Sequence, residues 1–198
     1  MTLNNTKLYM LNKEEVLEAV EKTADSSLNC ELFDDSRYAI FPGFCDVHVH
    51  FREPGFFYKE SIKTGSMAAA RGGYVNVCTM PNLNPVPSDL ESLKIQLELI
   101  KDTSCVNIIP YATITRKGNG KSELSNMEDL ADFTIAYTDD GKGVQTQELM
   151  FEAMEEARKL DKIIVAHCED ETLLKGGYIH DGKYAKTHKH KGICSESK

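Results

Sequence analysis

A pair of histidines one residue apart, at the end of an apolar run, constrains this chain more than any other feature. The run opens with Phe41-Pro42-Gly43-Phe44 and ends in Asp46-Val47-His48-Val49-His50-Phe51-Arg52. Because strand side chains alternate between faces, His48 and His50 point the same way and can bind one metal ion. Arg52 continues on that face or lies in the loop just after it. Imidazole is a ligand suited to zinc, but a lone His-x-His pair is a weak signal.

Two downstream segments place further candidate ligands directly after apolar runs that have the character of strands. These segments are Thr138-Asp139-Asp140-Gly141 and Val165-Ala166-His167-Cys168-Glu169-Asp170. Metal ligands at the C-terminal ends of successive parallel strands are typical of a β/α-barrel hydrolase. The sequence therefore predicts a metal site at one end of such a barrel.

The chain alternates apolar strand-like runs with amphipathic stretches from Phe41 onward. The predicted strands are 44–51, 74–79, 105–114, 133–138 and 162–167. Continuous apolar strands in a β-α-β-α series imply parallel strands covered by helices. We therefore expect an α/β fold that contains about five βα units of a TIM-type barrel. A complete barrel needs eight strands and about 250 residues, so the predicted barrel is incomplete in this chain.

Three helices are predicted between these strands. One begins near Glu60 and ends at Gly72-Gly73, which read as a C-cap. A second is opened by a capping box of Ser88 and Glu91 and runs through Ile100. The third spans 144–160, where Val144, Leu149, Met150, Met154 and Ala157 form a stripe expected to face the core.

Composition excludes several classes of protein. The chain of 198 residues has a formal net charge of -8, which argues against nucleic acid or an anionic membrane surface as a partner. No apolar run is long enough for a membrane span, and the first ten residues lack the apolar core of a secretory signal. The six cysteines are scattered, as expected for buried thiols in a reducing cytosol. We therefore expect a cytoplasmic protein.

Four motifs in the chain occur together, in order, in a known family. They are His48-Val49-His50-Phe51-Arg52-Glu53-Pro54-Gly55, Met80-Pro81-Asn82, Tyr137-Thr138-Asp139-Asp140-Gly141 and Ala166-His167-Cys168-Glu169-Asp170. Together they resemble the type I class of bacterial dihydroorotases, members of the amidohydrolase superfamily. The resemblance runs from about Phe41 to the last residue. It implies zinc-dependent, reversible cyclisation of N-carbamoyl-L-aspartate to dihydroorotate in de novo pyrimidine (UMP) biosynthesis.

The resemblance also implies a set of metal ligands for one or two zinc ions. His48 and His50 are the expected first ligands of the more buried ion, with Asp140 completing that site and His167 binding in a second site. Asp139 competes with Asp140 for this role. Some relatives use a carbamylated lysine here, but no lysine lies between residues 122 and 141. The simpler alternatives are satisfied core histidines and an aspartate that only forms a turn.

The remaining expected roles concern the substrate and proton transfer. Arg52 should clamp a substrate carboxylate, because a planar guanidinium matches a carboxylate in a bidentate way. Asn82 should make a second substrate contact. The alternatives are a surface salt bridge for Arg52 and a loop-forming role for Asn82. The general acid/base, an aspartate in the family, is expected beyond Lys198, so the isolated chain should be inactive.

Other polar motifs are given structural interpretations. His188-Lys189-His190 lies in a basic, solvated stretch, and His180 is expected in a loop. Cys168 has no base nearby in sequence and reads as a packed thiol. Gly118-Asn119-Gly120-Lys121 lacks the phosphate-loop pattern and reads as a turn.

The N-terminal 40 residues depart from the family, whose members usually carry strands of a small side domain there. Asn12 can cap a short helix through Lys22, with Val16, Leu17 and Val20 on one side. A remnant of the side domain would then be Cys30-Glu31-Leu32-Phe33 and Tyr38-Ala39-Ile40. We therefore expect two parts, residues 1–40 as this remnant and 41–198 as the N-terminal part of the barrel.

Two other functions remain open at this point. One is a different cyclic amidohydrolase, such as a hydantoinase or allantoinase. The other is a non-catalytic, dihydroorotase-like subunit that serves as a scaffold for a partner such as aspartate transcarbamoylase. A homo-oligomer is a further possibility for an incomplete barrel.

Overall fold

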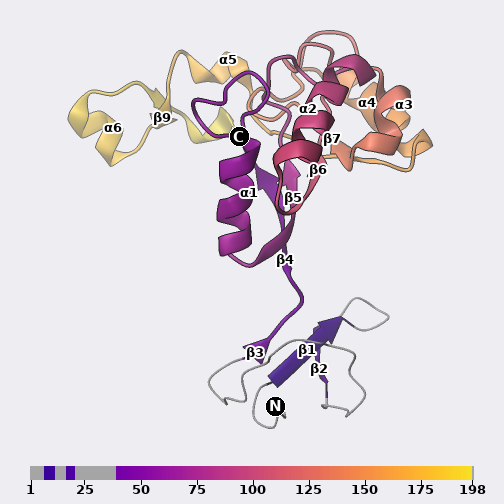
Figure 1. Cartoon of the computed structure of the whole chain (residues 1–198). Coiled ribbons are helices and arrows are strands. Elements are labelled where there is room, and N and C mark those ends of the chain that lie inside the picture. Colours follow the sequence, from indigo (N-terminus) through magenta and orange to yellow (C-terminus); the bar gives the residue numbers. More distant parts are fainter. Residues whose placement is uncertain (1–6, 12–16, 21–38, 198) are drawn as a thin grey trace. The chain divides into compact units, whose positions relative to one another are not determined.

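The computed structural model describes residues 7–11, 17–20 and 39–197 (Figure 1). It divides into two compact units, Met1–Phe44 and Cys45–Lys198. Within the described residues, no helix is both long and apolar enough to cross a lipid bilayer.

The first unit contains a small sheet. Strand β1 (Lys7–Leu11) pairs antiparallel with β2 (Leu17–Val20) and parallel with β3 (Ala39–Ile40), in the order β2-β1-β3. The helix expected from Asn12 through Lys22 is therefore wrong at Leu17–Val20. Pairing with β1, in which Leu11 lies opposite Leu17, overrides the local helical spacing. Asn12, Val16, Lys22 and Cys30–Phe33 lie outside the described residues.

The second unit is built on parallel strands. Strands β4 (Phe44–Val49), β5 (Tyr74–Thr79) and β6 (Asn107–Pro110) form one sheet in the order β4-β5-β6. Strands β7 (Ala136–Tyr137) and β8 (Ile163–Ile164) form a parallel pair. A parallel bridge between Ala112 and Tyr137 connects the chain after β6 to β7. The five expected strands are present in order, but all except β5 are shorter than predicted.

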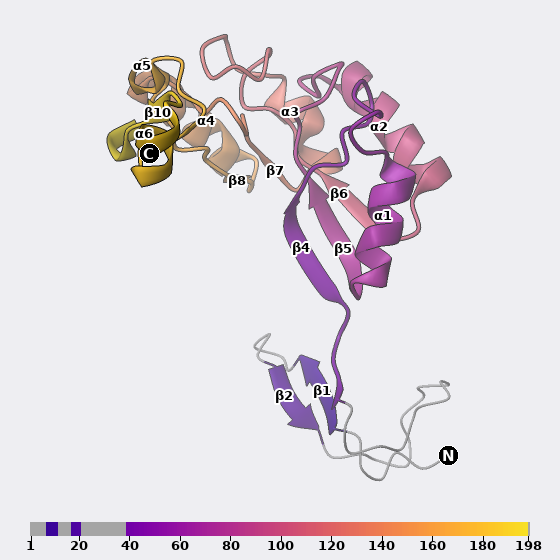
Figure 2. The ribbon, with the colours of Figure 1, turned by 90° about the vertical axis from the view of Figure 1, so that its left-hand side faces the viewer.

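The helices of this unit are bounded by side-chain caps. Helix α1 (Ile62–Arg71) begins at Ser61, whose hydroxyl accepts the backbone N–H of Thr64, and ends at Gly72 as expected. Helix α4 (Gln147–Lys159) begins at the N-cap Thr146. Figure 2 shows α1 and α2 (Leu90–Thr103) on the same side of the sheet β4-β5-β6.

The N-cap of α2 differs from the prediction by one residue. The capping box consists of Asp89 and Ser92, with the Asp89 carboxylate accepting the Ser92 N–H at 2.9 Å. Ser88, the predicted cap, is instead buried, and its carbonyl accepts the Asn126 N–H. Both residues are good caps, and the sequence gives no reason to prefer one over the other.

Short elements fill the connections and the C-terminal region. They are α3 (Met127–Leu130), the 3₁₀ turn η1 (Ala131–Phe133), α5 (Glu171–Leu174), β9 (Ile179–His180), α6 (Lys183–His188), β10 (Gly192–Ile193) and the 3₁₀ turn η2 (Ser195–Ser197). Strands β9 and β10 pair in parallel.

Helix α4 buries only part of the predicted stripe. Ala153 and Ala157 are buried, whereas Met154 is 56% exposed. The two alanines are one turn apart and contact a cluster that includes Leu93, Tyr137 and Leu130. The predicted stripe is wrong at Met154, because small side chains let the helix approach the strands closely.

The expectation of buried thiols is only partly correct. Cys78 in β5 is fully buried, and its burial and the neighbouring Cys45 raise the pKa of its thiol to about 11. Cys45, Cys105 and Cys168 are exposed, and none of the described cysteines is in a disulfide. Cys30 lies outside the described residues.

Exposed apolar side chains on the strands predict self-association of the isolated chain. Val47 in β4 and Ile163 in β8 are each 61% exposed. Expressed alone, the chain should form oligomers above micromolar concentration, and the double variant Val47→Thr with Ile163→Thr should shift it toward the monomer in sedimentation velocity. Each change should alter the free energy of unfolding by no more than about 0.5 kcal/mol, because both side chains are exposed. A wild-type chain that stays monomeric would contradict this.

Candidate metal centre

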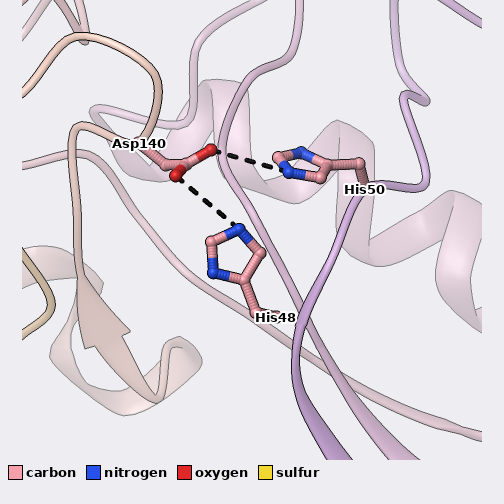
Figure 3. Close-up of side chains that lie close together, drawn as sticks. All are labelled: His48, His50 and Asp140. Atoms are coloured by element: carbon pink, nitrogen blue, oxygen red, sulfur yellow. Dashed lines mark ion pairs between the residues drawn. The ribbon is translucent and has the colours of Figure 1, made fainter. Parts of the chain in front are cut away.

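Three side chains from two strand ends converge in the second unit (Figure 3). His48 lies in β4, His50 follows that strand by one residue, and Asp140 lies three residues after β7. His48 Nε2 is 3.6 Å from Asp140 Oδ1, and His50 Nε2 is 3.7 Å from Asp140 Oδ2. One donor atom from each residue lies within 4.8 Å of the other two. The alternation that we expected along β4 therefore brings both imidazoles to one carboxylate.

His167, after β8, lies against the same carboxylate. Its Nδ1 is 3.6 Å from Asp140 Oδ1, and its Nε2 is 3.7 Å from Glu169 Oε2. Asp140 thus contacts all three histidines, and its side chain is only 12% exposed. Glu169 was not predicted as part of the site. A carboxylate two residues after a candidate ligand is the sequence signal that could have revealed it.

The two adjacent aspartates have different environments. Asp139 is 1% exposed, and its carboxylate accepts the backbone N–H groups of Ile114, Thr115 and Gly120 as well as the Thr115 hydroxyl. With four donors on its two oxygens, Asp139 is occupied in holding the 114–120 loop. Asp140 has its carboxylate among the histidines, so this arrangement favours Asp140 over its neighbour as the ligand.

Hydrogen bonds to backbone carbonyl oxygens hold Asp140 in position. The Asn82 side-chain amide donates a hydrogen bond to the Asp140 carbonyl oxygen. The turn that follows is closed by Lys142 N–H and Gly143 N–H, both of which donate to the Asp139 carbonyl. Gly120 approaches so closely that a Cβ there would lie 1.6 Å from the Gly143 carbonyl oxygen. A side chain at residue 120 would therefore displace this turn.

The surroundings of His50 favour its neutral form. Burial, and then the nearby positive charge of Arg52, lower the pKa of His50 below its usual 6.5. Asp140 and the Asn82 side chain raise that pKa, but by less than the lowering causes together. The neutral imidazole is the form that binds a metal ion.

A cavity of about 310 Å³ lies beside Asp140. Its lining includes the predicted substrate residues Arg52 and Asn82, together with two cations that the sequence analysis missed, Lys59 and Lys142. Arg52 has a φ of 40°, in the left-handed region, which costs on the order of 1 kcal/mol for a side chain with a Cβ. The predicted substrate residues and the candidate ligand Asp140 therefore share one cavity.

The other histidines are not part of this cluster. His180 Nε2 is 3.1 Å from the Ser195 hydroxyl, and His188 Nδ1 is 3.0 Å from the Tyr184 carbonyl oxygen. His190 Nδ1 is 2.5 Å from the Tyr178 hydroxyl. All three imidazoles are exposed and lie in or beside α6, β9 and β10.

The donor set fits a zinc ion. Zinc–ligand distances of about 2.0–2.2 Å place tetrahedral ligand atoms roughly 3.3–3.6 Å apart. The His–Asp140 distances of 3.6 and 3.7 Å are close to that range. His48, His50 and Asp140 would hold one ion, and His167 with Asp140 would contribute to a second.

Comparison with known proteins places this site in a family context. Residues 38–198 match a family model described as dihydro-orotase-like. The chain is 48% identical over 196 residues to a dihydroorotase of Fusobacterium nucleatum, covering 98% of this chain and 46% of that protein. It is 47% identical over 182 residues to a dihydroorotase of Bacillus subtilis, covering 91% of this chain and 42% of that protein. The chain therefore spans less than half the length of these relatives.

A solved structure shares the fold. The L-hydantoinase (dihydropyrimidinase) from Arthrobacter aurescens superposes with a TM-score of 0.62 at 16% identity, over 87% of this chain and 41% of that one. At this identity the likeness concerns the fold alone. It supports an α/β arrangement built on parallel strands.

The neighbouring aspartates should separate stability from metal binding. Asp139→Asn replaces an acceptor of four hydrogen bonds by an amide whose NH₂ group faces donors, so the free energy of unfolding should fall by at least about 2 kcal/mol. Asp140→Asn should leave the metal-free protein about as stable as wild type but abolish stoichiometric zinc. Urea titration and metal analysis measure these effects. Loss of zinc with Asp139→Asn at unchanged stability would reverse the assignment.

Zinc content should also distinguish ligand from substrate residues. His50→Ala should lose zinc, because it removes one of three clustered donor atoms. Arg52→Met should retain zinc, because a guanidinium is not a metal ligand. Atomic absorption after gel filtration measures both contents. A metal-free Arg52→Met protein that is still folded by circular dichroism would contradict the role of Arg52 as a carboxylate clamp.

Proposed function

This chain belongs to the dihydro-orotase-like family, and from that premise we propose that it carries the metal-binding part of a zinc-dependent dihydroorotase. The proposed reaction is the reversible cyclisation of N-carbamoyl-L-aspartate to dihydroorotate, a step in the synthesis of pyrimidine nucleotides. The observation that carries the proposal is the cavity beside Asp140. Asp140, which belongs to the cluster of candidate metal ligands, lines this cavity together with the candidate carboxylate-binding cations.

Zinc would be held by His48, His50, Asp140 and His167. When bound, it supplies a hydroxide at neutral pH by lowering the pKa of coordinated water from about 15.7 toward 7, and it polarises the amide oxygen. Protein residues must then bind the substrate carboxylate, orient the ring and transfer a proton.

Arg52 is the proposed clamp for the substrate carboxylate. Its guanidinium lines the cavity, and within the described part of the chain it forms no ion pair with an acidic residue. An anionic ligand would therefore pair with a charge that no acidic residue in the described part of the chain neutralises.

Asn82 is the proposed second contact. Its Nδ2 is engaged by the Asp140 carbonyl, whereas its Oδ1 is buried and makes no hydrogen bond of normal geometry among the described residues. The Asn82 side chain also interacts with His50, whose pKa it raises, and its Oδ1 is an acceptor that suits an N–H group of the substrate ring. One short side chain would thus connect the substrate to the backbone of a metal ligand.

Proton transfer requires a group that these clusters do not supply. The general acid/base is expected beyond Lys198, and such groups typically contribute 10²–10⁴-fold to the rate. We propose that zinc binding and substrate binding reside in this chain and that turnover needs the remaining part of the barrel. Association with aspartate transcarbamoylase or with a second copy stays a prediction from the family resemblance.

An activity assay tests this proposal. The purified, zinc-loaded chain should hydrolyse dihydroorotate no faster than the zinc-containing buffer. The same chain joined to the C-terminal part of the Fusobacterium nucleatum relative, here called the completed protein, should be at least 100-fold faster, because it regains the acid/base. The control is the completed protein with His50→Ala. Turnover by the chain alone within tenfold of the completed protein would show that the acid/base lies within residues 1–198.

A different substrate preference would point to the other amidohydrolases. If the completed protein opened hydantoin or allantoin faster than dihydroorotate at equal concentration, the proposed substrate would be wrong. The metal centre would still stand in that case, since it is measured separately by zinc content.

A further inference from the structure

Lys59 lines the cavity beside Asp140, but neither the family motifs nor the metal chemistry accounts for it. It is an exposed lysine in the loop between β4 and α1, seven residues after Arg52. Among the described residues it makes no ion pair with a carboxylate. Lys142, on the same cavity, differs in lying 3.8 Å from Glu171. Lys59 is therefore a cation with capacity for an anionic ligand.

Successive turns connect Lys59 to Arg52. The Phe56 N–H donates to the Arg52 carbonyl at 2.8 Å, and the Lys59 N–H donates to the Phe56 carbonyl at 2.9 Å. Both cations line one cavity. These backbone hydrogen bonds set the spacing of the two residues along the main chain.

Contacts outside the loop hold it in place. The Glu53 carboxylate accepts the Ile62 N–H at the start of α1, at 2.9 Å. Gly55 has a φ of 96°, and a Cβ there would lie 2.4 Å from the Asn84 carbonyl oxygen. The Asn84 N–H in turn donates to the Pro54 carbonyl. The loop is therefore packed against the segment that carries Asn82, the proposed second substrate contact.

Aromatic rings restrict the ammonium group of Lys59. Its Nζ lies 5.5 Å from the centroid of the Phe56 ring and 5.8 Å from that of Tyr58. Cation–π contacts of this kind orient an ammonium without neutralising it. A carboxylate bound in the cavity would gain a charge-assisted hydrogen bond at a small additional cost in side-chain entropy.

We propose that Lys59 is a second carboxylate-binding cation, which shares the substrate carboxylate with Arg52 and gives the site its preference for ring amides that carry a carboxylate. This inference rests on the proposed function. Arg52 supplies planar, bidentate recognition, and Lys59 supplies a compact charge from the neighbouring turn. A ring amide without a carboxylate offers neither cation a negatively charged partner.

The test uses two ligands that differ by one group. L-Dihydroorotate and 5,6-dihydrouracil share a ring, and only the first carries a carboxylate. Their affinities for the zinc-loaded chain are measured by calorimetry, and their kcat/KM values are measured with the completed protein. Lys59→Met should weaken dihydroorotate about tenfold and change dihydrouracil less than twofold. Lys59→Arg should restore most of the loss, because it keeps the charge.

The matched control is Lys63→Met, which removes the same charge from the exposed face of α1, outside the cavity lining. It should change neither ligand by more than twofold. The affinity for dihydroorotate should also fall more steeply with salt in the wild-type protein than in Lys59→Met. The variant lacks one of the positive charges that salt screens in the wild-type cavity.

The possible outcomes separate this inference from the proposed function. If Lys59→Met weakens both ligands equally, Lys59 supports the shape of the cavity, and the inference is wrong. If neither ligand is affected, it is also wrong. If the folded, zinc-loaded wild-type protein binds no dihydroorotate, the proposed function itself fails, and the inference fails with it.

Discussion

The carboxylate of Asp139, buried among backbone N–H groups, is the interaction on which the site depends. It joins the end of β7 to the loop that contains Ile114, Thr115 and Gly120. Because this carboxylate is directed into the protein, the next residue is free to present its own carboxylate to the histidines. The same loop contributes Gly118 to the cavity wall. A single buried acid thus positions both a candidate metal ligand and part of the proposed substrate cavity.

A second constraint acts on the loop between β4 and α1. That loop starts at the histidine pair, turns at Arg52 and ends where Glu53 accepts the first N–H of α1. The candidate metal ligands and the proposed substrate-binding cations therefore lie on one short segment of backbone. Contacts of Glu53 with α1 and of Pro54 with Asn84 hold that segment in place. Movement of α1 would be transmitted to both, since the Glu53 contact and the cation-bearing turns belong to one segment.

Much of this arrangement could be predicted from the sequence, and the predictions that were wrong have physical causes. Side chains two residues apart in a strand lie on the same face because of the geometry of the extended backbone. The shared direction of His48 and His50 could therefore be predicted from their spacing alone. The choice between Asp139 and Asp140 could not, because it depends on donors from a loop more than twenty residues away. The strand at Leu17–Val20 was missed because pairing with β1 is a non-local interaction. Met154 was misplaced because the predicted stripe favoured the larger apolar side chain over the neighbouring Ala153, which is the residue that the helix buries beside Ala157.

The distribution of charge is compatible with the proposed binding of an acidic substrate by an acidic chain. The net charge of -8 would repel an anion at long range, but that repulsion is screened beyond about 8–10 Å at physiological salt. Among the residues that line the cavity, the three cations Arg52, Lys59 and Lys142 outnumber the two acids, Asp139 and Asp140. The Asp139 carboxylate accepts backbone N–H groups, and the Asp140 carboxylate is directed toward the histidines. A bound metal ion would therefore face negative charge, and a bound anion would face positive charge. This separation gives a carboxylate-bearing ring one favoured orientation, with its carboxylate at the cations and the opposite side of the ring toward the metal centre.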